Sequence, residues 1–221
     1  MQKSNEGLIG FLLDLPIFEA EWVLWLLIIL WFVSVAVMIE RYAFFHKRQV
    51  DATRIRSELD KLLRAGNFKK AASLLEKSDS LETNVVLFGL RQFAKGPEAV
   101  EDLLTGAESS EKQRFQKRLS FLATVGSNAP FIGLFGTVLG IIKAFGELGA
   151  DLSAAGGDLM NGISEALVAT GVGLVVAIPA VIAFNYFNAK LEQRVANTDL
   201  LARTLLAQLK SEEENAGAEA A

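Results

Sequence analysis

The sequence predicts an all-α integral membrane protein with three transmembrane helices. Hydrophobic residues make up 51% of the 221 residues, and the mean hydropathy is +0.31. These residues form three long blocks separated by charged sequence, and a helix needs roughly 20 mostly apolar residues to cross a bilayer core. The chain length alone would allow one or two soluble domains. The prediction of a membrane protein therefore rests on the three apolar blocks.

The first block, residues 22–39, contains no charged residue and holds all three tryptophans, and Tyr42 follows its end. Aromatic residues near the ends of a span suit the headgroup region, so we expect a transmembrane helix here. Residues 1–21 before it are expected to form a periplasmic segment. Its short apolar stretch, which Pro16 would end, is expected to be an interfacial helix.

The second and third blocks are residues 119–145 and 163–186. No helix breaker interrupts the apolar pattern before the second block, so one helix is expected to begin near Glu108 and to continue into the membrane. Leucines recur at helical spacing after the third block. Residues 187–221 are therefore expected to extend that helix out of the membrane and to end in an acidic tail.

Residues 40–118 are expected to form a helical cytoplasmic domain, because short apolar runs recur there at helical spacing. Gly66 is expected to stop one helix and Asn67 to cap the next, and Gly96-Pro97 marks a further break. These features predict about four helices.

The distribution of positive charge predicts the orientation. Residues 40–118 contain 16 Lys and Arg, whereas the Gly-rich loop at residues 146–162 contains none. Positive residues stay on the cytoplasmic side, so the N-terminus and the loop are predicted to be periplasmic and the C-terminus cytoplasmic. The basic run from Arg41 to Arg56 is interpreted as an anchor for membrane lipids of the inner leaflet.

Small residues line one face of each of the last two blocks. The faces are formed by Gly133, Thr137, Gly140 and Ala144 in the second block, and by Ala166, Thr170, Gly173, Ala177 and Ala180 in the third. Larger residues are expected on the opposite sides: Leu139, Ile142, Leu174, Val175 and Ile182. Two interpretations stay open, ordinary close packing of helices and a smooth wall that lines a pore or faces a moving guest helix.

Polar residues at membrane depth favour the pore interpretation. Thr137 and Thr170 can bond to their own helix carbonyls, or they can line a narrow water path. Glu165, about one turn from Thr170, is either a helix-start carboxylate or an ionisable group of a proton path. Pro130 and Pro179 are expected to kink the two helices.

Composition excludes several function classes. The chain has no cysteine and one histidine, so it offers no Cys-based or His-cluster metal site, and no cofactor is expected. The glycines do not form a phosphate loop, and a net charge of −4 does not indicate a nucleic-acid partner. We therefore predict that the protein is not an enzyme. Lys143 is interpreted as a side chain that snorkels to the membrane surface or pairs with Glu147.

Residues 129–141 and 162–180 resemble the second- and third-helix signatures of the ExbB/TolQ/MotA proton-channel family, and Glu40-Arg41 also fits. The resemblance covers nearly the whole chain, and three spans rather than four favour the ExbB/TolQ branch. It implies a homopentamer in the bacterial inner membrane around two copies of an ExbD/TolR-like partner, each with one span and an essential membrane Asp.

The resemblance also assigns roles within a motor driven by the proton-motive force. Thr137 and Thr170 correspond to the pore threonines, and Glu165 corresponds to the third-helix glutamate, whereas Lys143 departs from the neutral or His residue expected there. The work driven would be TonB-dependent uptake, Tol-type envelope maintenance or gliding motility. A non-conducting structural scaffold is the alternative. A small-solute transporter would need inverted repeats or broken helices, and neither is visible in the sequence.

Overall fold

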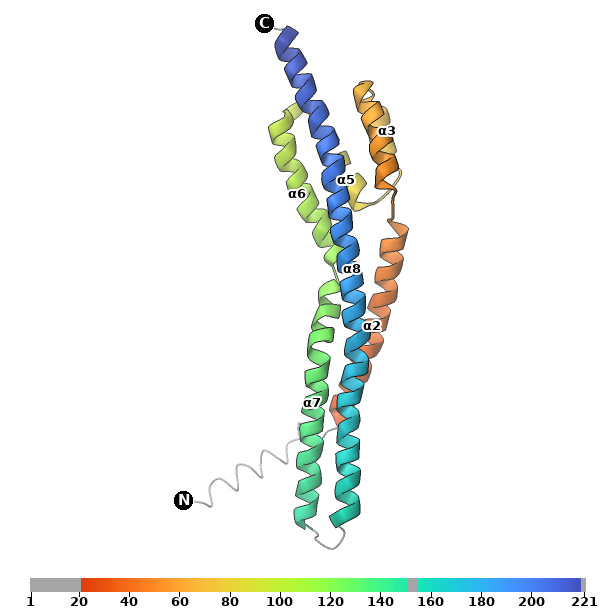
Figure 1. The fold of residues 1–221 in the computed structure, drawn as a ribbon, viewed down its shortest axis with the longest axis vertical. Helices are drawn as coiled ribbons and strands as arrows, with labels where there is room; N and C mark the ends of the chain where they lie inside the picture. Colours follow the sequence, from red (N-terminus) through yellow and green to blue (C-terminus); the bar gives the residue numbers. More distant parts are fainter. Residues whose placement is uncertain (1–20, 151–154, 220–221) are drawn as a thin grey trace, which may run out of the picture. The chain divides into compact units, whose positions relative to one another are not determined.

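The computed structural model describes residues 21–150 and 155–219. These residues form helices without any strand, in the order α2 (Glu21–Lys47), α3 (Ala52–Arg64), α4 (Phe68–Leu75), α5 (Leu81–Arg91), the 3-10 helix η2 (Phe93–Lys95), α6 (Pro97–Gln116), α7 (Leu119–Ala150) and α8 (Ala155–Glu219) (Figure 1). Three of the described helices, α2, α7 and α8, are long and apolar enough to cross a membrane. The predicted fold class is therefore confirmed.

Helical structure extends further into the expected loop at residues 146–162 than predicted, because α7 continues to Ala150 and α8 begins at Ala155. The interfacial helix expected within residues 1–21 falls in residues 1–20, which lie outside the described part of the chain. The last two residues of the acidic tail also lie outside it.

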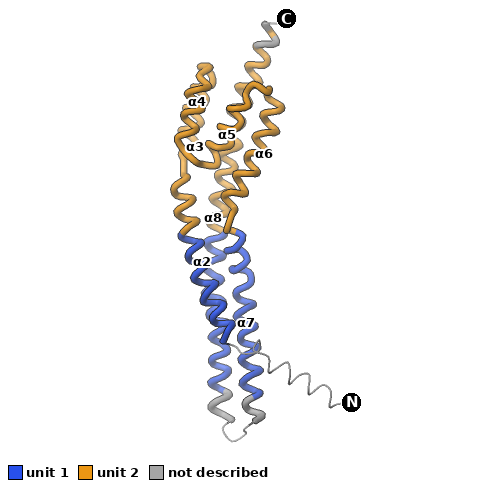
Figure 2. The backbone as a smooth tube through the Cα atoms, turned by 180° about the vertical axis from the view of Figure 1, so that it is seen from behind, with its two compact units in different colours: residues 1–39, 120–184 blue, residues 40–119, 185–221 orange. Residues whose placement is uncertain are grey.

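The chain divides into two compact units (Figure 2). Unit 1 comprises residues 1–39 and 120–184, and unit 2 comprises residues 40–119 and 185–221. Unit 1 therefore contains the apolar parts of α2, α7 and α8, and unit 2 contains the charged segments. The division after residue 39 coincides with the end of the first apolar block.

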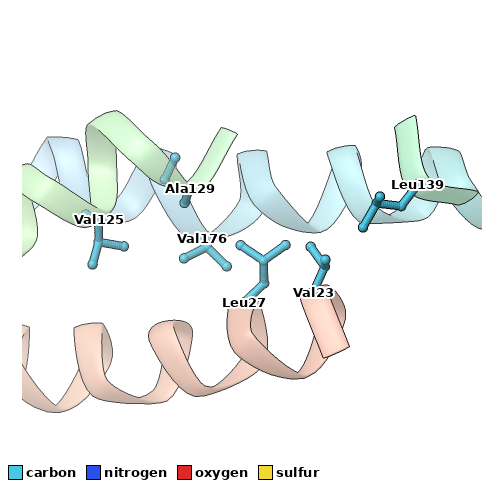
Figure 3. Packing of buried hydrophobic residues seen from close by; sticks show 8 residues of the cluster. Val23, Leu27, Val125, Ala129, Leu139 and Val176 are labelled. Atoms are coloured by element: carbon cyan, nitrogen blue, oxygen red, sulfur yellow. The ribbon is translucent and has the colours of Figure 1, made fainter. Parts of the chain in front are cut away.

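An apolar cluster joins the three helices of unit 1 (Figure 3). It contains Val23 and Leu27 of α2 together with residues of the other two helices, namely Val125, Ala129, Leu139, Val176, Ala177 and Ala180. Leu139, which we expected on the side of its helix opposite the small residues, is a member of this cluster and is only 1% exposed. The other four large residues, Ile142, Leu174, Val175 and Ile182, are exposed.

In unit 2, the four predicted helices are present as α3, α4, α5 and α6. Gly66 has a φ of +66° in the turn after α3, and Asn67 occupies the N-cap position of α4, although its side chain makes no capping hydrogen bond. Gly96 has a φ of +86° immediately before Pro97, the first residue of α6. These turns need left-handed backbone, which glycine adopts without steric cost, so the predicted breaks are confirmed.

The prediction of one helix running from near Glu108 into the membrane is wrong. α6 ends at Gln116, Lys117 has φ −48° and ψ 131°, and Arg118 has a φ of 69° before α7 begins. Arg41 stabilises this break, because its guanidinium donates to the Lys117 carbonyl at 3.0 Å. Glu40 adds an ion pair with Arg118 at 3.2 Å.

Candidate functional site

The small-residue faces of α7 and α8 are packed against each other in unit 1. A Cβ placed on Gly140 would lie 2.6 Å from the Cβ of Ala166, and one on Gly162 would lie 2.8 Å from the Cβ of Ala144. Residue numbers rise along α7 as they fall along α8, so the two faces meet in antiparallel register. We call this contact the α7–α8 seam.

Two glycines bring the backbones of the two helices into direct contact. A Cβ on Gly133 would lie 2.6 Å from the carbonyl oxygen of Ala169, and one on Gly173 would lie 2.7 Å from the carbonyl oxygen of Ala129. Real Cβ atoms do not approach other heavy atoms so closely. Because the opposing atoms belong to backbone, they cannot rotate away, and only glycine fits at these two positions.

The seam shows what the small residues do within one chain. All seven predicted pore-lining residues are buried: Gly133, Gly140, Ala144, Ala166, Gly173, Ala177 and Ala180. Their structural role in the single chain is close packing, one of the two interpretations that the sequence left open. A further role in lining a pore stays a prediction.

Thr137 and Thr170 meet inside the seam. Their hydroxyl oxygens are 2.5 Å apart, and the Thr137 hydroxyl also lies 3.3 Å from the carbonyl of Gly133 and 3.2 Å from the carbonyl of Ala166. A hydroxyl has one proton to donate and two lone pairs, so Thr137 donates to one of these acceptors at a time. The sequence placed the two threonines on matching faces, and the structure brings them together.

This hydroxyl pair can orient and hydrogen-bond a water molecule or a carboxyl group, but neither hydroxyl titrates in the physiological range. Thr137 is only 8% exposed, whereas Thr170 is half-buried. Thr170 is therefore the member of the pair that a neighbouring molecule can reach. A group that binds and releases a proton here must come from outside the pair.

A polar hollow of about 340 Å³ lies beside the seam in unit 1. Small residues of the seam, among them Gly140 and Ala166, line it together with Glu21, Lys143 and Glu165. Glu165 is exposed and lies five residues before Thr170, which corresponds to about 7.5 Å along a helix. The hollow therefore brings two carboxylates and one ammonium group to the same end of the seam.

Lys143 and Glu165 share this hollow, a pairing that the sequence did not suggest. The partner expected for Lys143 was Glu147, whose side chain lies outside the described part of the structure. Glu21 and Asn161 also line the hollow and were missed. Glu21 precedes the first apolar block, and no spacing rule relates it to residues more than 100 positions away.

Pro130 and Pro179 lie inside α7 and α8, and both helices continue through them. A proline removes one backbone donor, so the carbonyls of Gly126 and Val175, four residues earlier, lose their helical partners. The kinks expected at these two positions stay predictions.

The chain was compared with known proteins. A profile of the MotA/TolQ/ExbB proton channel family matches residues 77–199. The Tol-Pal system protein TolQ of Pseudomonas aeruginosa is 39% identical over 139 residues, which are 63% of this chain and 55% of that protein. The biopolymer transport protein ExbB of Xanthomonas campestris pv. campestris is 40% identical over 117 residues, 53% of this chain and 46% of that protein.

A third relative, the putative biopolymer transport protein ExbB-like 2 of Helicobacter pylori, is 49% identical over 87 residues, 38% of this chain and 56% of that protein. The chain therefore spans about half the length of the curated relatives it matches. The family match includes α7, the seam and the part of α8 up to residue 199.

Proposed function

Because this chain belongs to the MotA/TolQ/ExbB proton channel family, we propose that it is the proton-channel subunit of a bacterial inner-membrane motor. It forms a homopentamer around two copies of an ExbD/TolR-like single-span partner that carries a membrane Asp. The motor uses the proton-motive force for work across the cell envelope, namely TonB-dependent uptake, Tol-type envelope maintenance or gliding motility. The observation that supports the proposal is the Thr137–Thr170 hydroxyl pair inside the seam.

A neutral hydroxyl pair complements a partner carboxyl. A carboxylate in hydrocarbon is costly when charged and inexpensive when protonated, so the partner Asp needs a place where it can exchange its proton. Thr170 can donate to the charged form and accept from the protonated form, because a hydroxyl does both. One proton crossing about 100 mV supplies roughly 2.3 kcal/mol, and several crossings drive a conformational step.

The polar hollow supplies the entrance of this path. Glu165 and Lys143 lie there with Glu21, close to the small residues of the seam. The excess of positive charge in residues 40–118 supports a cytoplasmic unit 2 and, with it, a periplasmic position for the hollow. Protons entering from the periplasm reach the ionisable groups of the hollow first and the threonine pair next.

The rival function is a non-conducting scaffold, and one observation favours it: the small residues of the seam are already buried against each other in the single chain. Thr170→Val separates the two functions, because valine keeps the shape of threonine and removes the hydroxyl. The variant and its partner would be co-expressed, purified and reconstituted into vesicles. Assembly would be measured by mass and proton flux by an internal pH dye.

The proposal predicts a normal assembly with flux at least about tenfold lower, which corresponds to the loss of one buried hydrogen-bonding group in the path. Thr124→Val is the matched control. Thr124 lies on α7 as well, but it is exposed and donates to the Ser120 carbonyl of its own helix. Unchanged flux in Thr170→Val would contradict a role of the hydroxyl pair in the path, and an absence of flux through the unaltered assembly would support the scaffold.

A further inference from the structure

A groove of about 380 Å³ in unit 2 is lined by a buried carboxylate. The end of α2 contributes Tyr42 and His46, α5 contributes Glu82, and α8 contributes Tyr186 and Lys190. The groove lies entirely within unit 2 and shares no residue with the hollow beside the threonine pair.

One oxygen of the Glu82 carboxylate lacks a donor. Its side chain is 2% exposed, and its Oε2 atom has no hydrogen-bond partner among the described residues. The guanidinium of Arg194 is 3.8 Å from that oxygen, which is too long for a hydrogen bond. A buried acceptor without a partner is costly, and burial accordingly raises the pKa of the Glu82 carboxyl.

The guanidinium of Arg194 makes its two hydrogen bonds to other groups, so it reaches Glu82 only as an ion pair. It donates to the carbonyls of Arg48 at 2.6 Å and Phe45 at 2.8 Å. These carbonyls lie at the C-terminal end of α2, where a helix leaves acceptors unpaired and favours a positive charge. The arrangement leaves a place beside Glu82 for a second cationic donor.

The groove changes from aromatic to polar along its length. Tyr42 is 61% exposed and follows the first apolar block by three residues, and Tyr186 is 50% exposed at the end of the third block. Exposed tyrosines at the ends of spans lie at headgroup depth. One helical turn further along their helices, His46 and Lys190 add basic groups that attract phosphate.

From this geometry we infer that the groove binds the headgroup of an aminophospholipid. The primary ammonium group donates to Glu82, the phosphate faces Lys190 and His46, and the acyl chains leave past the two tyrosines. A choline headgroup carries no N–H to donate, and a glycerol headgroup carries no cation, so both fit Glu82 less well. This lipid site does not depend on proton conduction and would exist equally in a scaffold.

The test is native mass spectrometry of the full chain in detergent with added lipids of identical acyl chains. Phosphatidylethanolamine is expected to be retained about tenfold more than phosphatidylcholine or phosphatidylglycerol, a difference typical of one charge-assisted hydrogen bond. Glu82→Gln is expected to abolish this preference. Glu108→Gln should keep it, because Glu108 is also a partly buried carboxylate of unit 2 but lies outside the groove.

Equal retention of the ethanolamine and choline lipids would overturn the inference, since the carboxylate would then hold only water. A preference for phosphatidylglycerol would also overturn it, because the lipid would then be bound by His46 and Lys190 without Glu82. If Glu82→Gln fails to fold, stepwise N-methylation of the lipid headgroup tests the inference on the unaltered chain, where retention must fall when the third methyl group removes the last N–H. Thr170→Val should retain the lipid preference, so failure of the proton path and failure of the lipid site are distinguishable.

Discussion

Glycine allows helices to pack closely in both units, but the atoms that oppose it differ between the two examples. In unit 1, Gly133 and Gly173 face backbone carbonyls of the opposing helix, whereas in unit 2 a Cβ on Gly89 would lie 2.6 Å from Cδ2 of Leu104. A leucine side chain can change rotamer, and a helix backbone cannot. The comparison indicates that the α7–α8 seam is a rigid contact and that the helical domain of unit 2 can adapt.

The hydrogen bonds inside the two units also differ in charge. Unit 1 holds a neutral hydroxyl pair, Thr137 and Thr170. Unit 2 holds charged groups, such as Asp79, which accepts two hydrogen bonds from Arg114 at 2.6 and 2.7 Å. Lipid makes charge costly, so the proposed proton path through unit 1 relies on hydroxyls and on the carboxyl of the proposed partner.

The largest expected loss of stability is in unit 2, from Arg194→Ala. The substitution leaves Glu82 buried without its nearest cation and leaves the carbonyls of Phe45 and Arg48 without a donor. Removing one member of a buried ion pair costs about 3 kcal/mol. Thermal unfolding followed by circular dichroism measures the effect. Arg203→Ala is the control, since Arg203 pairs with Asp199 on an exposed surface, and it should cost less than about 1 kcal/mol.

The next largest effect is expected in the seam, from Gly173→Ala. The new methyl group would meet the Ala129 carbonyl, and overpacking against a rigid neighbour costs about 2 kcal/mol. Gly171→Ala is the matched control on the same helix, because no side chain or neighbouring helix lies within 4 Å of the added Cβ. Equal melting temperatures for the two variants would contradict the rigid seam.

A smaller effect is expected from Gly89→Ala in unit 2. The added methyl group meets the flexible ends of Leu104 and Leu205, and the variant gains up to about 1 kcal/mol in helix propensity. The net change should therefore be under about 1 kcal/mol in either direction. A loss as large as that of Gly173→Ala, measured in the same thermal scan, would show that the two units do not differ in adaptability.

The smallest effect concerns the pH dependence of unit 2. The bonds from Arg114 hold the pKa of Asp79 well below its usual range. A lowered carboxyl pKa contributes stability above the unfolded value of about 4, and the contribution is lost as the pH falls below that value. Because Asp79 is 51% exposed, the contribution should stay below about 1 kcal/mol.

Asp79→Asn is therefore expected to lower the melting temperature slightly near neutral pH and to make a smaller difference at about pH 2, because the contribution declines as the pH falls from the unfolded pKa toward the lower folded pKa. Melting curves of the variant and the unaltered chain across this pH range test the direction in which the difference in melting temperature changes with pH. A difference that grows as the pH falls would contradict it.

Local features of the sequence predicted much of this structure. The three apolar blocks, the turns at Gly66 and Gly96, and the matching faces of Thr137 and Thr170 all follow from periodicity and backbone preferences, which act over a few residues. Features that depend on distant contacts were missed. The break at Arg118 contains no glycine or proline and is held by Arg41, and Leu139 is buried in a cluster to which α2 contributes Val23 and Leu27.

The polar site was predicted only in part for the same reason. Spacing along a helix placed both threonines on facing sides, but it could not relate Lys143 to Glu165 or add Glu21 to their hollow. The pairing of Glu82 with Arg194 joins α5 to α8 across more than 100 residues. Such contacts arise from the tertiary fold and leave no periodic pattern.

Water access to Thr170 tests most directly the claim that the threonine pair lies on a proton path. The chain has no cysteine, so Thr170→Cys and the outward-facing Val175→Cys each carry one thiol. Reconstituted with the proposed partner, Thr170→Cys should react with a small water-soluble thiol reagent and lose its proton flux, while Val175→Cys should not react. A protected thiol at position 170, or a modified one with undiminished flux, would contradict the account.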